Sequence, residues 1–207
     1  MKVVLILVWL IFSIVGFSQT KLLFLGDSLT AGYLLPKENA FPNQFEKQLS
    51  DHSVTVTNAG ISGDTSYTLL HRLPYALTPT PNVVFLCIGA NDGLRGFPID
   101  DIKKNITRIV HILNQKNIPI IFAGMSLPDN YTKHYIESFK QMYQDIAKDH
   151  QLLFLPFLLE PVAGNRSLNL ADGIHPNQEG HQKIAAFILD FLKKEAWVSS
   201  SNQWVYK

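Results

Sequence analysis

The sequence lacks the features that mark several large classes of protein. It has one cysteine, Cys87, so no intrachain disulfide can form and the fold must be stabilised by its core. The 18 basic residues nearly balance the 17 acidic ones and form no basic patch, which gives no case for a nucleic-acid partner. The seven histidines show no spacing typical of metal ligands, and no phosphate-binding glycine loop is present. We therefore expect neither a metal nor an organic cofactor.

Charge is almost missing from the first 18 residues. Lys2 is the only charged side chain there, and Val3–Val15 is almost wholly apolar but short for a membrane span of about 20 residues. Gly16 and Ser18 are small residues that bracket the end of this run. The pattern predicts a signal peptide, 1–18, cleaved after Ser18, with an uncleaved anchor helix as the alternative. We therefore expect a periplasmic or secreted protein, and no cysteine follows the run as a lipoprotein would require.

The remaining chain has the size and composition of one soluble domain. Hydrophobic residues make up 46% of the sequence and charged residues 17%, with a net charge of +1. No repeat, low-complexity segment or linker divides it. We expect a single domain over 19–195 and a C-terminal tail over 196–207 that carries two of the three tryptophans. The sequence leaves open whether this tail docks, and it does not indicate an oligomeric state.

Apolar strands alternate with amphipathic helices along this domain. We expect strands at 21–25, 54–57, 83–88, 119–123 and 152–156, and helices at 41–50, 69–77, 99–115, 132–149 and 178–194. This alternation predicts an α/β fold built on a parallel sheet with right-handed crossovers. Loops at 58–65 and 89–93 then follow two strands, at the edge of the sheet where ligands bind in such folds.

The first strand ends in Gly26-Asp27-Ser28, where the chain turns into a short helix. Ser28 has two interpretations. As a helix N-cap it would accept a hydrogen bond from the first turn. As a nucleophile it would form an oxyanion facing the free N–H groups of that same turn. Taken alone, this stretch favours the cap.

Three further polar clusters change that interpretation: Ser62 to Asp64, Asn91 with Asp92, and Asp172 with His175. Each alone reads as an ordinary loop. Together they hold what acyl transfer needs. A neutral imidazole suits a general base near neutral pH, and a nearby carboxylate can fix its tautomer. The backbone N–H groups of Ser28 and Gly63 and the amide of Asn91 are candidate oxyanion donors.

The sequence also resembles a known family. The blocks GDSLTAGY (26–33), NAGISGDTS (58–66), GANDGLRG (89–96) and DGIHPNQEGH (172–181) are similar to the four signature blocks of the SGNH (GDSL) hydrolases. Within this family, the sequence most resembles the bacterial periplasmic acyl-CoA thioesterase, lysophospholipase and arylesterase group. This resemblance includes the LPDNY loop (127–131) and spans about Leu22–Leu192. It implies a three-layer α/β/α fold with a flavodoxin-like sheet of five parallel strands.

The resemblance also implies roles for individual residues. Ser28 would be the nucleophile, His175 the base and Asp172 its partner. The oxyanion hole would consist of Ser28, Gly63 and Asn91.

The same resemblance suggests how substrate binds. Loops matching 93–97 and 127–131 line an acyl-chain groove in the resembling enzymes, which implicates Leu94, Phe97, Leu127 and Tyr131; the alternative is that these residues cap the core. The expected substrate is a small-molecule acyl ester or a lysolipid, and a lysolipid would bring peripheral contact with membrane lipid. Two other functions stay open: a carbohydrate or acetyl esterase on the same scaffold, and a non-catalytic ligand-binding module.

Five other residues receive interpretations outside the proposed chemistry. Cys87 is expected to pack in a buried strand. Asp27 and Asp64 are expected to hold loops through side-chain hydrogen bonds. His181 is expected on the surface or at a helix cap. Arg95 could meet an anionic head group or remain solvated in its loop.

Overall fold

The computed structural model describes residues 19–50 and 53–206. The predicted signal peptide, 1–18, lies outside the described residues. Among the residues that are described, none of the helices has both the length and the apolar character needed to cross a membrane.

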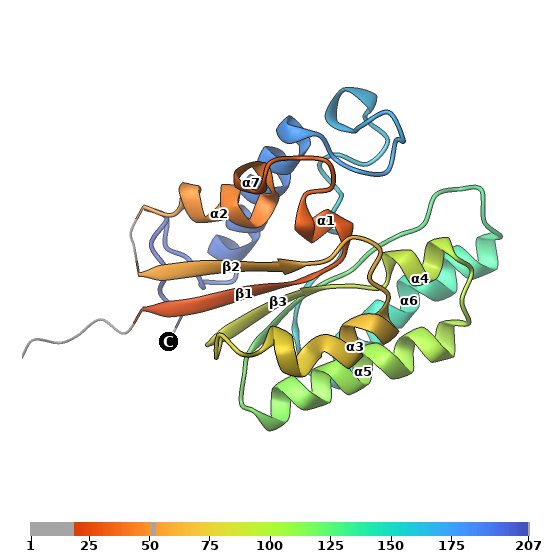
Figure 1. The fold of residues 1–207 in the computed structure, drawn as a ribbon, viewed down its shortest axis with the longest axis horizontal. Helices are drawn as coiled ribbons and strands as arrows, with labels where there is room; N and C mark the ends of the chain where they lie inside the picture. The colour runs from red at the N-terminus through yellow and green to blue at the C-terminus, as the bar shows by residue number, and fades with distance from the viewer. Residues whose placement is uncertain (1–18, 51–52, 207) are drawn as a thin grey trace, which may run out of the picture.

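A single sheet of five parallel strands forms the centre of the molecule (Figure 1). Its strands are β1 (Thr20–Gly26), β2 (Val54–Gly60), β3 (Val83–Cys87), β4 (Ile120–Ala123) and β5 (Leu153–Leu155). They lie in the order β2-β1-β3-β4-β5, which is the flavodoxin-like order. The predicted α/β fold with a five-stranded parallel sheet is confirmed.

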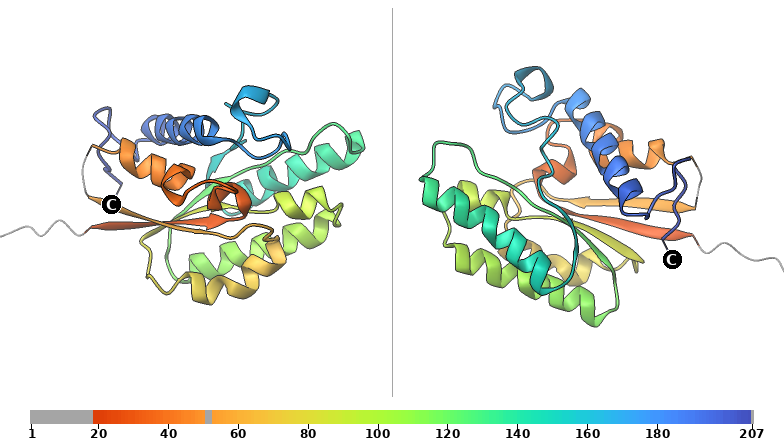
Figure 2. Two further views of the ribbon diagram at one scale, coloured as in Figure 1. Left: turned by 45° about the horizontal axis from the view of Figure 1, so that its top comes forward. Right: turned by 180° about the vertical axis from the view of Figure 1, so that it is seen from behind.

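Helices cover both faces of the sheet, which gives the three layers (Figures 1 and 2). The α-helices are α1 (Ser28–Ala31), α2 (Phe41–Gln48), α3 (Ser66–Ala76), α4 (Ala90–Leu94), α5 (Ile99–Gln115), α6 (Lys133–Asp149) and α7 (Gln178–Lys194). Two 3-10 turns, η1 (Lys37–Asn39) and η2 (Arg166–Leu168), lie in the connections. Helices α2 and α7 pack together on one face, while α3, α5 and α6 cover the other.

The central strands are apolar because both of their faces are covered. Every residue of β3 is buried, including Cys87, as expected. The ring of Phe24 in β1 stacks on Phe85 in β3 at a centroid distance of 4.9 Å. Phe41 and Phe45 of α2 contact the same ring from above the sheet. This aromatic cluster fixes α2 against the strands that lead to the loops described below.

Three elements differ from the sequence-based expectation. Strand β2 continues through Asn58 to Gly60, where a loop was predicted, because its last residues pair with the end of β1. Helix α3 starts at Ser66 rather than Leu69, since Thr65 and Thr68 form a capping box. The predicted turn at 89–93 contains the short helix α4.

The C-terminal tail, which the structure describes over residues 196–206, docks on the body of the domain. Asn202 accepts a hydrogen bond from the backbone N–H of Ser50 and donates one to the carbonyl of Gln48, at the end of α2. Trp204 is only 8% exposed and meets Trp197 edge-on. The tail therefore lies at the opposite end of α2 from the loops that form the site.

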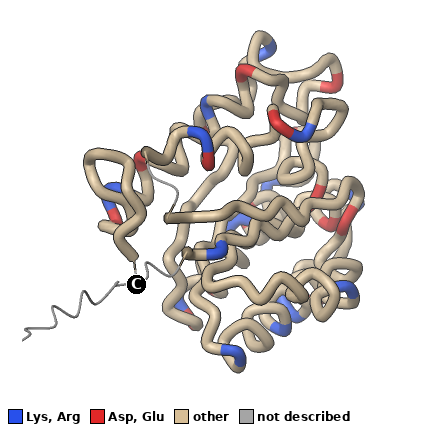
Figure 3. Tube along the Cα trace, turned by 60° about the vertical axis from the view of Figure 1, so that its left-hand side comes forward, with Lys and Arg blue, Asp and Glu red and all other residues tan. Residues whose placement is uncertain are grey.

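Acidic and basic residues are intermixed along the trace (Figure 3). This view shows no continuous basic face over the described residues. The distribution agrees with the near-neutral sequence.

Candidate active site

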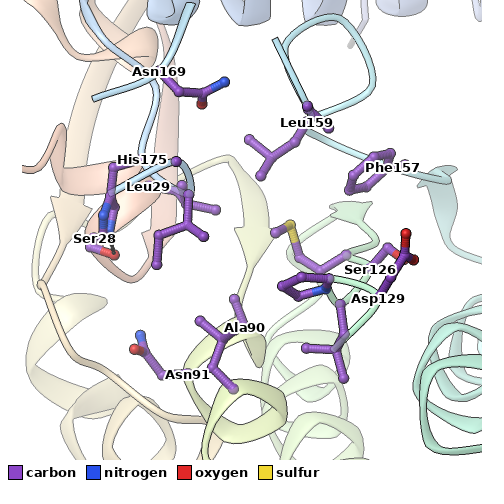
Figure 4. Close-up of a pocket in the computed structure, with 18 residues that line it drawn as sticks. Ser28, Leu29, Ala90, Asn91, Ser126, Asp129, Phe157, Leu159, Asn169 and His175 are labelled. Atoms are coloured by element: carbon purple, nitrogen blue, oxygen red, sulfur yellow. Dashed lines mark hydrogen bonds between the residues drawn. The ribbon is translucent and has the colours of Figure 1, made fainter. Parts of the chain in front are cut away.

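The first three strands end at the same level of the sheet. Gly26 of β1 lies opposite Gly60 of β2 and Cys87 of β3. The strand order reverses between β1 and β3, so the loops that follow these strands diverge and leave a crevice. Ser28 enters this crevice from the β1 side and Asn91 from the β3 side (Figure 4).

A chain of hydrogen bonds joins Ser28, His175 and Asp172. The Ser28 Oγ lies 2.8 Å from the His175 Nε2 (Figure 4). The His175 Nδ1 lies 2.8 Å from the Asp172 Oδ2. The structure thus brings together three predicted site residues, two of which are 147 positions apart in sequence.

The Asp172 carboxylate is held in its ionised form. Partial burial alone would raise its pKa, but hydrogen bonds from the His175 ring, the His175 backbone N–H and the Ile174 backbone N–H outweigh burial and lower the pKa. An ionised carboxylate at Nδ1 favours the tautomer that carries its proton there. The His175 Nε2 is then free to accept the hydroxyl proton of Ser28.

Backbone bonds fix the position of His175 in its loop. Its carbonyl accepts a hydrogen bond from Leu170 N–H at 2.7 Å. Pro176 forms an antiparallel bridge with Asn169, and Asn177 caps α7 by accepting from Gly180 N–H at 3.0 Å. The loop that carries Asp172 and His175 is therefore anchored to the start of α7.

His181 anchors α7 in turn. It was expected on the surface or at a cap, yet it is 1% exposed, so the surface interpretation is wrong. Its Nδ1 accepts from the N–H of Phe41, the first residue of α2, at 3.1 Å. Burial lowers its pKa to about 4, so the imidazole stays neutral and keeps an acceptor for that N–H. The side chain caps α2 rather than its own helix.

Tyr33 covers the imidazole of His175 and was not singled out in the sequence. The two ring centroids are 4.5 Å apart. Tyr33 lies in the turn after α1, where its N–H donates to the carbonyl of Ser28. The sequence held one indication that Tyr33 belongs to the site: it is the last residue of the first signature block, seven residues after Gly26.

The three candidate oxyanion donors have different surroundings. Ser28 N–H belongs to the first turn of α1, where N–H groups have no intrahelical partner. One amide N–H of Asn91 donates to the carbonyl of Asp64 at 2.9 Å, which leaves its second N–H available. Gly63 has φ +87°, a left-handed conformation that favours glycine. Ser28 and Asn91 both line the pocket described below, whereas Gly63 is not among its lining residues.

Asp64 holds the loops under the site together, as expected. Its Oδ2 pairs with the Arg72 Nε at 2.6 Å, and its Oδ1 accepts from the Thr68 hydroxyl. Arg72 also donates to the carbonyls of Gly26 and Ala59. One guanidinium therefore ties the ends of β1 and β2 to α3.

Asp92 performs a similar task for α3 and was predicted only as part of a polar cluster. It accepts hydrogen bonds from the N–H and the hydroxyl of Ser66, the first residue of that helix. Burial raises its pKa. Asp92 therefore joins α4 to α3 and positions the neighbouring Asn91.

Asp27 caps the helix that carries Ser28. Its Oδ1 accepts from Leu29 N–H at 3.0 Å, which confirms the expected loop-holding role. The side chain is fully buried, and its Oδ2 has no hydrogen-bond partner within the described chain. Burial, with the nearby charges of Asp64 and Asp92, raises its pKa to about 7.

A pocket of about 480 Å³ opens beside Ser28 and His175 (Figure 4). Its walls are largely apolar and come from four loops: Leu29, Leu94, Met125, Leu127, Phe157 and Leu159 are among the lining side chains. Leu29, Met125, Phe157 and Leu159 were not predicted as lining residues. Phe157 and Leu159 lie in an irregular segment. Its sequence mixes apolar residues with turn-forming residues, and no pattern in it indicated which side chains face the pocket.

Two residues expected in this pocket lie outside its lining. The Tyr131 hydroxyl donates to the carbonyl of Leu94 at 2.6 Å, so Tyr131 supports the wall instead of forming it. Phe97 is 40% exposed, and its carbonyl accepts from the Tyr135 hydroxyl. Leu94 and Leu127 do line the pocket.

We find no set of metal ligands in the part of the chain that the structure describes. No group of three histidine, cysteine or acidic side chains there is placed to hold a metal ion.

Known proteins are similar to this chain in sequence and in fold. Residues 24–183 match the model of the GDSL-like lipase/acylhydrolase family. An arylesterase of Vibrio mimicus is 38% identical over 180 residues, which cover 86% of this chain and 90% of that protein. A protein of Escherichia coli named as a thioesterase, protease and lysophospholipase is 36% identical over 175 residues, covering 84% and 82%.

A solved structure of an esterase is also similar to this chain in fold. The psychrotrophic esterase EstA from a Pseudoalteromonas species, inhibited by monoethylphosphonate, superposes with a TM-score of 0.81 at 30% identity. The match covers 86% of this chain and 99% of that one.

The buried carboxyl of Asp27 predicts a pH-dependent stability. An unfolded Asp27 releases its proton near its ordinary pKa of 3.8, whereas the folded protein retains it up to about pH 7. The unfolded state therefore binds fewer protons between these values, and stability falls as pH rises through that window. In Asp27→Asn, which keeps an N-cap oxygen, this contribution should vanish. The difference in free energy of unfolding, wild type minus variant, should fall by up to roughly 4 kcal/mol from pH 4 to 8.

Urea unfolding across that pH range measures this difference. Asp100→Asn, at an exposed position, controls for the loss of one carboxyl group. Parallel curves for wild type and Asp27→Asn would show that Asp27 does not hold its proton in the folded state.

Proposed function

The chain belongs to the GDSL-like lipase/acylhydrolase family and is an ester hydrolase of the esterase and thioesterase type, and we propose that it works through an acyl-enzyme on Ser28. The observation that carries this proposal is the unbroken path of hydrogen bonds from the Ser28 Oγ through the His175 imidazole to the Asp172 carboxylate. A serine hydroxyl needs a base at hydrogen-bond distance to become a nucleophile, and His175 occupies that position.

In the first half of the reaction, the Ser28 Oγ attacks the ester carbonyl carbon while its proton passes to the His175 Nε2. The Asp172 carboxylate stabilises the resulting imidazolium, because it is already hydrogen-bonded to Nδ1. The tetrahedral oxyanion faces Ser28 N–H, the free amide N–H of Asn91 and Gly63 N–H. The imidazolium then gives its proton to the leaving alcohol or thiol, and the carbonyl re-forms as an ester of Ser28.

In the second half, water attacks the acyl-enzyme. His175 takes a proton from this water and returns it to the Ser28 Oγ as the acid leaves. Tyr33 covers one face of the imidazole and narrows the approach of solvent to it. The products are a carboxylic acid and the free enzyme.

The apolar pocket supports an acyl chain or an aryl group as the acid portion of the substrate. Its lining offers leucine, methionine and phenylalanine side chains in the same pocket as Ser28. The names of the relatives, arylesterase and thioesterase with lysophospholipase, support fatty-acyl, aryl and lysophospholipid esters as the substrate class. A lysolipid substrate would place the protein in peripheral contact with membrane lipid.

We also propose that this activity lies outside the cytoplasm. The support is the N-terminal sequence: one charge at Lys2, the apolar run Val3–Val15, and small residues up to Ser18. Acyl-CoA is a cytoplasmic metabolite, so esters of the cell envelope suit an exported enzyme better than acyl-CoA does.

Hydrolysis of a p-nitrophenyl ester series, from acetate to palmitate, tests the substrate class and the mechanism together. We expect kcat/KM to rise with chain length by up to about fourfold per methylene until the pocket is filled. Ser28→Ala should lose essentially all turnover, with unchanged folding by circular dichroism. Activity confined to acetate would favour an acetyl esterase, and a folded wild type without activity on any ester would favour a binding module.

Asn91→Ala tests the oxyanion hole. The loss of one donor should lower kcat by about 10²–10³ with a small change in KM, because the bond strengthens only in the transition state. Since Asn91 also holds the Asp64 carbonyl, the free energy of unfolding of the variant should be measured alongside. Near-normal kcat in a folded variant would remove Asn91 from this role.

A further inference from the structure

A second cavity, of about 560 Å³, adjoins the apolar pocket beside Ser28, which we call the acyl pocket. The two cavities share three lining residues, Gly164, Asn169 and Gly173. The second cavity extends from them to Arg166 of η2 and to Asp172. It therefore begins at the loop that carries Asp172 and His175.

The boundary between the two cavities is open. A methyl group built on Gly164 or on Gly173 would meet no atom within 4 Å. Both glycines line both cavities, so this boundary has free space above its backbone. No side chain therefore fills the space above these two shared residues.

The two cavities differ in chemical character. Leucine, methionine and phenylalanine side chains line the acyl pocket, whereas the second cavity adds Asn165, Arg166 and Asp172, beside the apolar Leu170 and Ala171. An ester also has two unlike ends. If the acyl chain occupies the acyl pocket, the alcohol portion must extend from the reacting carbonyl carbon in another direction.

Arg166 supplies a charge that no other group uses. Its side chain is exposed, and within residues 19–50 and 53–206 no hydrogen bond or ion pair engages its guanidinium. The Asp172 carboxylate, by contrast, already accepts three N–H hydrogen bonds from Ile174 and His175. The cavity thus presents one uncommitted cation, and a guanidinium binds phosphate oxygens in a bidentate manner.

Arg95, the arginine that the sequence had singled out, is placed differently. Its Nη2 donates to the carbonyl of Gly63 at 3.2 Å, and its side chain lines neither cavity. The sequence had offered Arg95 as a contact for an anionic head group. The cavities favour Arg166 instead.

We propose that this second cavity is a subsite for the alcohol portion of a phosphate-bearing ester, with Arg166 binding the phosphate. This inference rests on the proposed function, because it needs an ester held at Ser28. The occupant is the glycerophosphate head of a lysophospholipid.

Two substrates with the same decanoyl chain test the subsite: lysophosphatidylcholine, which carries the phosphate, and 1-monoacylglycerol, which does not. Both are assayed below their micelle concentration, with wild type, Arg166→Gln and the matched control Arg95→Gln. We expect Arg166→Gln to raise KM for the lysophospholipid by about 3–10-fold and to leave both constants for the monoacylglycerol within about twofold. Arg95→Gln should leave the ratio of the two KM values unchanged.

The outcomes separate this inference from the proposed function. Equal effects of Arg166→Gln on both substrates, or no effect on either, would overturn the subsite while ester hydrolysis stands. A larger effect of Arg95→Gln on the lysophospholipid would assign the phosphate to Arg95 and would likewise overturn it. A wild type that hydrolyses neither these substrates nor any p-nitrophenyl ester would contradict the proposed function itself, and the subsite with it.

Discussion

The hydrogen bond between the Ser28 Oγ and the His175 Nε2 is the contact on which the rest of the site depends. It joins residues 147 positions apart, so neither local structure nor a single loop can make it. One partner is placed by the end of β1 and the cap from Asp27. The other is placed by α7, which His181 fixes to α2, which in turn packs on the aromatic cluster of the sheet. A disturbance at any of these anchors would act on the same 2.8 Å contact.

Beneath the contact between Ser28 and His175, the fold compensates the charge of several buried carboxyl groups. Three acidic side chains, Asp27, Asp64 and Asp92, are buried near the end of the sheet. Each is compensated in a different way: Asp64 by Arg72, Asp92 by the hydrogen bonds of Ser66, and Asp27 by retaining its proton up to about pH 7. Asp172, whose hydrogen bonds keep it ionised, lies behind His175, where a charge stabilises an imidazolium. The three buried carboxyl groups therefore add little uncompensated negative charge beneath the site.

Much of this could be predicted from the sequence, for a physical reason. Helices α5 and α7 have the bounds that their apolar periodicity predicts, and the central strands are continuous apolar runs because a parallel sheet is covered on both faces. The four polar clusters could be placed at one edge because parallel strands end there. Features set by tertiary contact were missed: the end of β2 follows its pairing with β1, and His181 is buried because α2 needs a cap. Phe157 and Leu159 were missed because an irregular segment has no periodicity that reveals which way its side chains face.

The most direct test of the central claim is covalent trapping. The protein is incubated with an alkyl p-nitrophenyl phosphonate, and the adduct is located by intact mass and peptide mass spectrometry. If Ser28 is the nucleophile activated by His175 and Asp172, one phosphonyl group should add per chain, on Ser28, and Asp172→Asn should react far more slowly. An adduct on another residue, or a folded protein that stays unmodified while it hydrolyses esters, would contradict the account.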